Sequence, residues 1–340
     1  MTVETLEISR ETLASLEATL LNASGSVPLH KRFRALFTLK ALKNDDAVGI
    51  ISKGFADESA LLKHELAYCL GQMKKTTALP TLESVLRNEE ENPMVRHEAA
   101  EAMGAISAPS SIPVLREYIS HTNRDVRETC EIALAKIEWD HSEEGQAHRR
   151  KEETEAQEGF QAYTSIDPAP PASGLLANKP VSTPVPTESI AELHRKLLDK
   201  QLPLFERYRA MFALRNIGSE EAVDALAAGF SDDSALFKHE IAFVFGQLLH
   251  PHSIPALLEV LRDNAESEMV RHEAAEALGG IATPDVLPHL KEWAAKEDAP
   301  RVVRESCVVA LDMYEYENSG AFQYADGLEG SEATAVAAAA

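Results

Sequence analysis

The stretch MVRHEAAEA at positions 94–102 recurs unchanged at positions 269–277, 175 residues further along the chain. Two other stretches recur at the same offset: KHELA at 63–67 returns as KHEIA at 238–242, and RFRALF at 32–37 returns as RYRAMF at 207–212. A constant offset over separate stretches indicates that the chain is a duplication of one unit. The two halves are therefore expected to share one fold.

A shorter period lies inside each half. Aligned on the His of the quoted stretch, equivalent positions within a half follow one another at steps of 31 or 33 residues. They are Phe33, His64, His97 and Glu128 in the first half, and Tyr208, His239, His272 and Glu305 in the second. Ala and Leu recur in these units at helical spacing, and proline fits the first turn of a preceding helix. Helix pairs at this period predict an all-α fold, an α-solenoid of HEAT-like helix pairs, with four pairs in each of two halves that face one another.

Composition divides the chain further. Residues 1–140 and 188–315 contain the repeats, whereas 141–187 are rich in Pro, Ser, Thr and charge without periodicity. Such a composition is typical of a flexible linker, and one of this length allows the second half to fold back against the first. Residues 316–340, which end in a run of alanines, are expected to be a disordered tail.

The net charge of -22 makes nucleic acid an unfavourable partner, because an acidic surface repels phosphates. A basic protein or a polyamine-like substrate fits better, although acidity can also simply aid solubility. The odd number of cysteines, three, argues against a disulfide framework, and no signal peptide or membrane-spanning stretch is evident. We therefore expect a cytoplasmic, monomeric protein.

The His-Glu dipeptide recurs only in the two central repeats of each half. The flanking repeats carry Phe, Tyr or Glu at the His position, so a purely structural role for the His is disfavoured. The second helices of adjacent repeats stack about 8–10 Å apart. His64 and His97 should therefore point into one shared space, and His239 and His272 into another, whereas a single His-Glu pair would more often be a polar surface feature.

The ligands must converge from different helices. A helical His-Glu-x-x-His zinc motif is absent, because Tyr68 and Glu101 stand at the fourth position after each His. Two His and a carboxylate per half suit iron with positions left open for dioxygen, and no Cys is involved as in structural zinc sites. Successive helical residues differ by about 100° in direction. Some of the four Glu should therefore have another role, such as binding a cationic substrate.

These residues resemble the deoxyhypusine hydroxylase family of HEAT-repeat dinuclear iron monooxygenases. The hallmark is four His-Glu motifs in two symmetric halves; here they are His64-Glu65, His97-Glu98, His239-Glu240 and His272-Glu273. The resemblance covers nearly the whole chain outside the linker and tail. It implies hydroxylation, with dioxygen and two iron ions, of the deoxyhypusine side chain in the precursor of eukaryotic initiation factor 5A, which gives hypusine.

The resemblance also implies residue roles. His64, His97 and Glu98 would bind one iron ion, and His239, His272 and Glu273 the other. Glu65 and Glu240 would hold the amino groups of the substrate arm. The basic residues beside each His are expected outside the site, paired with Glu of neighbouring helices; they are Lys63, Arg96, Lys238 and Arg271.

Two rival hypotheses remain at this point. A non-enzymatic HEAT scaffold that binds partner proteins predicts no metal, and a HEAT-type bilin lyase leaves the His-Glu symmetry unexplained. No Gly-x-Gly-x-x-Gly loop is present, so bound nicotinamide or flavin is not expected. Four residues at helical spacing are expected in the core: Met103, Phe243, Phe245 and Leu278.

Overall fold

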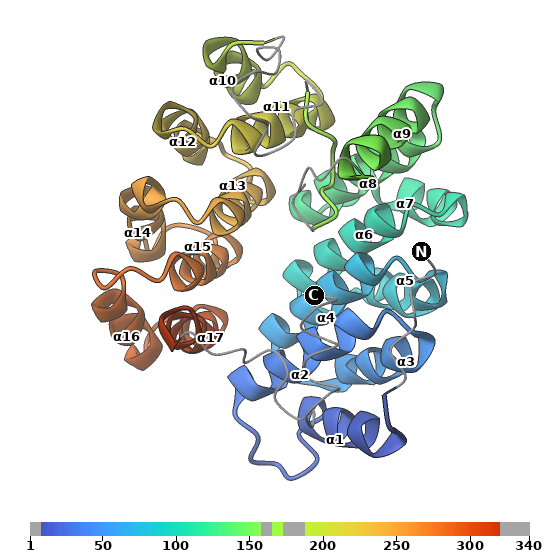
Figure 1. Cartoon of the computed structure of the whole chain (residues 1–340), viewed down its shortest axis with the longest axis vertical. Helices are drawn as coiled ribbons and strands as arrows, with labels where there is room; N and C mark the ends of the chain where they lie inside the picture. Colours follow the sequence, from blue (N-terminus) through green and yellow to red (C-terminus); the bar gives the residue numbers. More distant parts are fainter. Residues whose placement is uncertain (1–7, 158–164, 173–187, 320–340) are drawn as a thin grey trace.

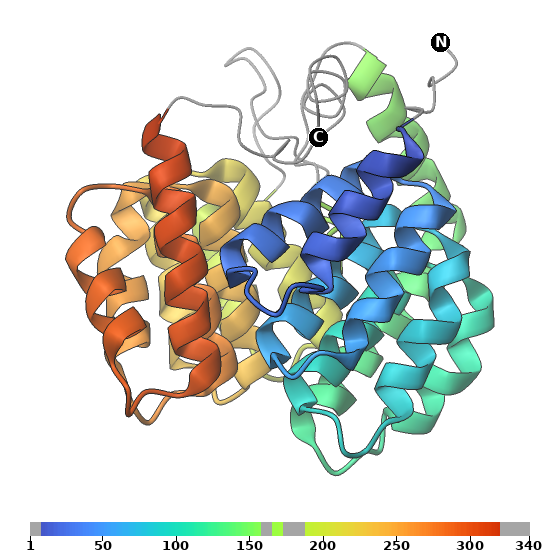
Figure 2. The ribbon, with the colours of Figure 1, turned by 90° about the horizontal axis from the view of Figure 1, so that it is seen from below.

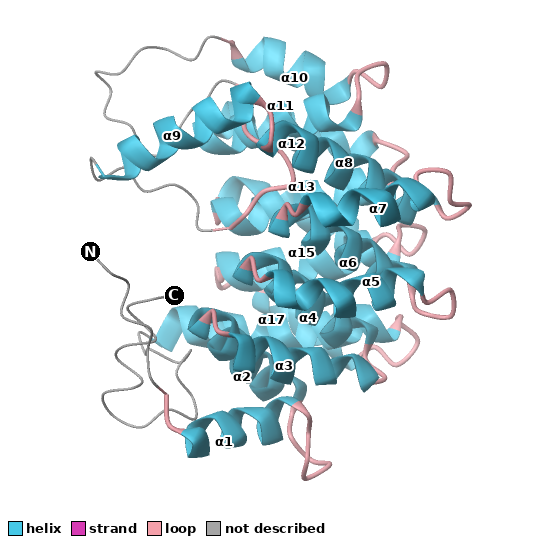
Figure 3. Cartoon of the chain, turned by 90° about the vertical axis from the view of Figure 1, so that its right-hand side faces the viewer, coloured by secondary structure: helices cyan, strands magenta, loops and turns pink. Residues whose placement is uncertain are grey.

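The computed structural model describes residues 8–157, 165–172 and 188–319. Within these ranges the chain forms helices and loops without a strand (Figure 3). The helices stand in two columns that face each other, the N-terminal column from blue to green and the C-terminal column from yellow to red (Figure 1). The predicted all-α solenoid is confirmed.

Each column contains four helix pairs among the described residues, as predicted. The N-terminal column comprises α1 (Arg10–Leu20), α2 (Leu29–Leu42), α3 (Asp45–Lys53), α4 (Ala60–Met73), α5 (Leu79–Arg87), α6 (Pro93–Ile106), α7 (Ile112–Tyr118) and α8 (Arg124–Asp140). The C-terminal column comprises α10 (Ile190–Leu198), α11 (Leu204–Ile217), α12 (Glu220–Ala227), α13 (Ala235–Leu248), α14 (Ile254–Arg262), α15 (Glu268–Ile281), α16 (Leu287–Ala295) and α17 (Arg301–Ser319). Short 3-10 turns accompany them: η1 (Gly54–Ala56), η2 (Thr76–Ala78), η3 (Pro109–Ser111), η4 (Ala228–Ser231) and η5 (Pro251–Ser253).

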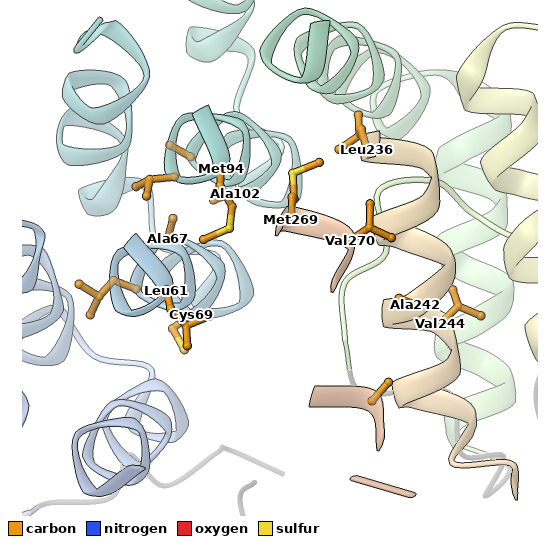
Figure 4. Packing of buried hydrophobic residues seen from close by; sticks show 14 of the residues in the cluster. Leu61, Ala67, Cys69, Met94, Ala102, Leu236, Ala242, Val244, Met269 and Val270 are labelled. Carbon is orange, nitrogen blue, oxygen red and sulfur yellow. The ribbon is translucent and has the colours of Figure 1, made fainter. Parts of the chain in front are cut away.

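Small side chains let the inner helices of a column approach closely. Figure 4 shows Leu61 and Ala67 of α4 next to Met94 and Ala102 of α6, and all four are buried. A Cβ added at Gly71 would lie only 2.8 Å from the Cα of Ala102. The tight packing of α4 on α6 is therefore possible because position 71 lacks a side chain.

The two columns are joined by matching hydrogen bonds at the starts of their central helices. Ser59 caps α4 and donates to Glu305 Oε2 of α17 at 2.7 Å, while Ser234 caps α13 and donates to Glu128 Oε2 of α8 at 2.6 Å. Glu128 and Glu305 occupy the His position of the flanking repeats, so these repeats use that position to join the halves. Figure 2 shows α17 beside the first N-terminal helices, and α17 contacts α2.

Two parts of the segment that was predicted as a flexible linker have defined structure. Residues Glu143–Gln157 form the helix α9, which continues the N-terminal column after α8. Residues 165–172, called the strap below, run between α8 and α11 (Figure 1), and Pro168 to Pro171 are buried. Prolines lack a backbone donor, so a Pro-rich stretch can be buried with few unmet hydrogen bonds.

The expected start of the tail is corrected. The helix α17 continues through position 316 to Ser319, because Tyr314 and neighbouring residues pack against the core. The rest of the predicted tail and the other parts of the predicted linker lie outside the described residues. No helix in the described part of the chain is long and apolar enough to cross a membrane.

Candidate metal centre

Four imidazoles meet between the columns. His64 lies on α4, His97 on α6, His239 on α13 and His272 on α15. Their ring centroids are 5.0 to 5.6 Å apart in the five measured pairs. At most 4% of each residue is exposed to solvent. The two His pairs therefore face each other and form one buried cluster at the interface of the halves.

The carboxylates lie around this cluster in a matching arrangement. Glu98 Oε2 lies 3.2 Å from His64 Nε2, and Glu273 Oε2 lies 3.4 Å from His239 Nε2. Glu65 Oε1 instead approaches Nδ1 of His64, at 3.3 Å. Glu65 and Glu98 thus flank opposite nitrogens of one imidazole, which agrees with the expectation that the Glu residues do not all have the same role.

Burial and the neighbouring carboxylates set the charge of the imidazoles. Burial lowers the pKa of His97 and of His272 well below the usual range, and nearby imidazoles lower each pKa further. For His64, burial also favours the neutral form, but the carboxylates of Glu98 and Glu65 outweigh it and raise its pKa. His97 and His272 are therefore held in the neutral form that binds metal.

The donor set fits metal ions. Both ring nitrogens of His97, His239 and His272 are buried without a hydrogen-bond partner in the described structure, a costly state unless another group binds them. One set of atoms close enough to share an ion comes from His64, His97 and Glu98, which is the first expected ligand set. A second set combines His64 with His239 and His272 and so crosses between the halves.

A cavity of about 430 Å³ adjoins the cluster. Seven Glu line it, and no Lys or Arg is found among its described lining residues; the seven are Glu65, Glu98, Glu101, Glu240, Glu273, Glu276 and Glu317. Glu65 and Glu240 are 7% and 1% exposed, and Glu240 Oε1 has no hydrogen-bond partner among the described residues. The cavity is thus suited to a cation, because buried carboxylates need a partner of opposite charge.

The basic residues beside each His point away from this cavity, as expected. Lys63 pairs with Glu91 at 2.6 Å and Lys238 with Glu266 at 2.5 Å, and both Glu lie in loops rather than on helices. Arg96 likewise pairs with Glu89 of a loop at 2.8 Å.

Arg271 departs from that expectation. Its Nε donates to Leu261 O at 3.1 Å, and its guanidinium carbon lies 4.6 Å from the ring centre of Trp293. The position equivalent to Glu89 in the second half is Asn264, so the expected carboxylate is replaced by an amide.

Sequence reasoning missed part of the cavity wall. Phe243 was predicted as core, but it is only partly buried and lines the cavity, with its ring 5.9 Å from that of Tyr68. Glu101 was interpreted only as a residue that breaks a zinc motif, and its counterpart Glu276 was given no role. Their presence in both copies of the nine-residue repeat was the available signal. The other three predicted core residues, Met103, Phe245 and Leu278, are buried.

Comparisons with known proteins agree with this architecture. The HEAT repeats family matches residues 49–135 and 225–312, and the PBS lyase HEAT-like repeat matches 206–232. A deoxyhypusine hydroxylase of Lentinula edodes is 67% identical over 324 residues, 95% of this chain and 98% of that protein. The chain belongs to the deoxyhypusine hydroxylase family. Its members include a protein of Mus musculus that is 49% identical, over 89% of this chain and 92% of the mouse protein.

A solved structure of a family member extends the likeness to the fold. Human deoxyhypusine hydroxylase in complex with glycerol is 47% identical, with a TM-score of 0.76 over 89% of this chain and 96% of the human one. The prediction of an enzyme of this family is confirmed. These relatives do not favour the non-enzymatic scaffold, and the match to a lyase-type repeat is confined to 27 residues.

Proposed function

We propose that the chain hydroxylates the deoxyhypusine side chain of the precursor of eukaryotic initiation factor 5A, with two iron ions and dioxygen. The observation that carries this proposal is the cluster of four buried imidazoles with unpartnered nitrogens beside a cavity lined by seven Glu. Imidazole and carboxylate ligands suit iron, and the buried cysteines lie elsewhere in the described core. The names of the relatives support the substrate.

The proposed ligand sets follow the two halves. His64, His97 and Glu98 hold one ion. His239, His272 and Glu273 hold the other. Iron, when bound, would activate dioxygen. Reduction of dioxygen takes four electrons, of which two come from the C–H bond and two from an external donor. The group of His64, His239 and His272 takes residues from both halves, so the residues that would hold the two ions adjoin one another at the interface.

The protein's own residues place the arm. Glu65 and Glu240 lie next to the cluster with their carboxylates in the cavity, so they can hold the ammonium groups of the arm by charge-assisted hydrogen bonds. Phe37, Tyr68 and Phe243 line the same cavity and offer apolar contact to the methylene groups between those charges. Fixing both ends of a flexible chain positions one carbon for oxidation and excludes water from it.

The net charge of -22 supports a basic macromolecular substrate, because long-range attraction speeds the encounter of opposite charges. We further propose that the protein acts in the cytoplasm, where its three buried cysteines stay reduced, and that it acts as a monomer. One chain supplies all four imidazoles, so a second copy is not needed to complete the site.

Metal analysis tests the proposal. Protein purified without added metal should contain about two iron ions per chain and should hydroxylate a deoxyhypusine-containing protein when dioxygen and a reductant are supplied. The matched control is the variant His97→Ala, whose loss of one imidazole should reduce the iron content. Protein that contains no iron and resists reconstitution with Fe(II) would refute the proposal.

A further inference from the structure

The cavity has an acidic pair at each end, related by the duplication. The offset of 175 residues relates Glu65 to Glu240 and Glu101 to Glu276. The rings of His64 and His272 lie 5.0 Å apart and those of His97 and His239 lie 5.4 Å apart, so α4 faces α15 and α6 faces α13 across the two halves. The pairs are therefore Glu101–Glu240 and Glu65–Glu276, each formed by one residue from each half.

The strap closes the Glu101–Glu240 end. Gln72 of one half accepts from Ile166 N at 2.8 Å, and Gln247, its counterpart in the other half, donates to Ser165 Oγ at 2.6 Å. The Asp167 carboxylate then accepts hydrogen bonds from both terminal nitrogens of Arg215, at 2.8 and 2.7 Å. The strap is thus held by both halves.

The strap also lies directly against this acidic pair. Pro168 and Glu101 line the same small gap beside α8. Arg215 is only 3% exposed, so the ion pair that anchors the strap is largely shielded from solvent. The strap therefore lies over this end of the cavity, where Glu240 is buried and Glu101 is partly buried.

Among the described residues, no segment equivalent to the strap lies at the Glu65–Glu276 end. Of the two exposed residues that line the cavity, Glu317 lies on α17, which contacts both α4 and α15, and Leu249 lies at the end of α13. Glu276 also borders an adjoining cavity of about 100 Å³ whose apolar wall includes Phe33, Phe37 and Met313.

The position equivalent to Arg215 at this end is Lys40, by the same offset. Its ammonium lies 4.6 Å from the ring centre of Phe37 and 5.9 Å from that of Tyr68. Arg215 instead anchors the strap, which belongs to the segment that links the two halves. The two ends of the cavity, otherwise equivalent by the duplication, therefore differ.

We propose that the substrate arm binds in one direction: the terminal ammonium lies between Glu101 and Glu240 beneath the strap, and the secondary ammonium lies between Glu65 and Glu276 near the mouth. This rests on the proposed function, in which the arm is an aminobutyl group on a lysine of a protein. Such an arm must enter by its free end, so the terminal ammonium reaches the closed end first. Glu240 is 1% exposed with Oε1 unpartnered among the described residues, as expected of a carboxylate that awaits a cation.

Glu101 and Glu276 therefore become substrate-binding residues in addition to the two His-Glu carboxylates. Two carboxylates around each ammonium can satisfy more of its donors than one. The arrangement also explains specificity: a shorter or uncharged arm leaves the buried Glu240 and its neighbour Glu101 without a counter-charge, which is unfavourable.

The test compares two probes on metal-loaded protein without dioxygen, by calorimetry. The first probe is N-acetyl deoxyhypusine amide. The second is the corresponding Nε-pentyllysine, in which a methyl group replaces the terminal ammonium. The unmodified protein should bind the pentyl probe about 10- to 100-fold more weakly.

The variants Glu101→Gln and Glu276→Gln form a matched pair. Glu101→Gln should weaken the diamine probe about tenfold or more and change the pentyl probe by less than about twofold, whereas Glu276→Gln should weaken both probes alike. Glu240→Gln and Glu65→Gln should repeat this pattern. Gln keeps the size of the side chain, and the metal content of each variant shows whether the site is intact.

Each other outcome is decisive. If the Glu276→Gln effect depends on the terminal ammonium and the Glu101→Gln effect does not, the direction is reversed and the proposal is wrong. If neither variant changes the affinity for either probe, neither Glu binds the arm. If the unmodified, metal-loaded protein binds neither probe, the proposed function fails, and the direction fails with it.

Discussion

The first prediction concerns the two related glycines at the ends of the metal-bearing helices, Gly71 and Gly246. A Cβ at position 71 would lie 2.8 Å from the Cα and 2.9 Å from the Cβ of Ala102, whereas at position 246 the closest atoms of Ala277 are at 3.5 Å. Ala in a helix is favoured over Gly by about 1 kcal/mol. Gly246→Ala should therefore leave the free energy of unfolding unchanged or raise it by up to about 1 kcal/mol.

Gly71→Ala should have the opposite effect. The colliding atoms are backbone and a methyl group, so no rotamer change can relieve the contact and α4 must move away from α6. Overpacking of this kind costs about 1–3 kcal/mol, which exceeds the gain in helix propensity. The movement also separates His64 from His97, whose ring centroids are 5.4 Å apart. Iron binding should weaken together with stability.

The measurement is urea unfolding of both variants without metal, followed by iron content after reconstitution. The two sites lie at the same place in the duplicated unit, so each variant is the control for the other. Equal destabilisation by the two substitutions would contradict this reasoning. A Gly71→Ala variant with unchanged stability and full iron content would show that the close approach of α4 and α6 does not affect the free energy of unfolding.

Three further predictions concern the site and the interface. His97→Ala should lower iron content, while Glu65→Gln should keep iron but reduce the rate of hydroxylation; iron loss of similar size in both would contradict the proposed division of roles. Glu101→Gln should raise the stability of the metal-free protein. Burial and the nearby Glu98 disfavour the charged form of Glu101 and raise its pKa, and a neutral Gln avoids the free-energy cost of holding that charge in the folded state; lower stability in urea unfolding would contradict this. Ser234→Ala should destabilise by about 1–2 kcal/mol, since it removes both a helix cap and the bond to Glu128; Ser219→Ala, which removes a cap without a bond between the halves, is the control.

The fold and the imidazole cluster could be predicted because duplication makes their pattern regular. Each His recurs at the same place in a unit, and stacked helices bring equal places side by side, so convergence follows from repetition alone. The same logic extends to Glu101 and Glu276, which belong to the unchanged nine-residue repeat. Glu101 was considered only in relation to a zinc motif, and Glu276 was not considered.

The strap could not be predicted in this way. Its sequence has no period, and its anchors come from distant places: Gln72 in one half and Arg215 and Gln247 in the other. A Pro-rich segment is usually solvated because it brings few side chains that can pack. Here three prolines are buried between helices, and the order of the segment depends on tertiary contacts that no local pattern encodes.

The strap also explains how a symmetric duplication can act on an asymmetric substrate. Two equivalent halves alone would create two equivalent ends, and an arm with a free and an attached terminus could bind in either sense. A covalent connection between the halves must pass on one side of their pseudo-symmetry axis, and the Asp167–Arg215 pair holds it there. Glu128 and Glu305 accept the symmetric bonds that join the columns, and these bonds do not involve the strap. Its distinct contribution is to cover one acidic pair and leave the other next to the mouth, which makes the two ends of the cavity chemically different.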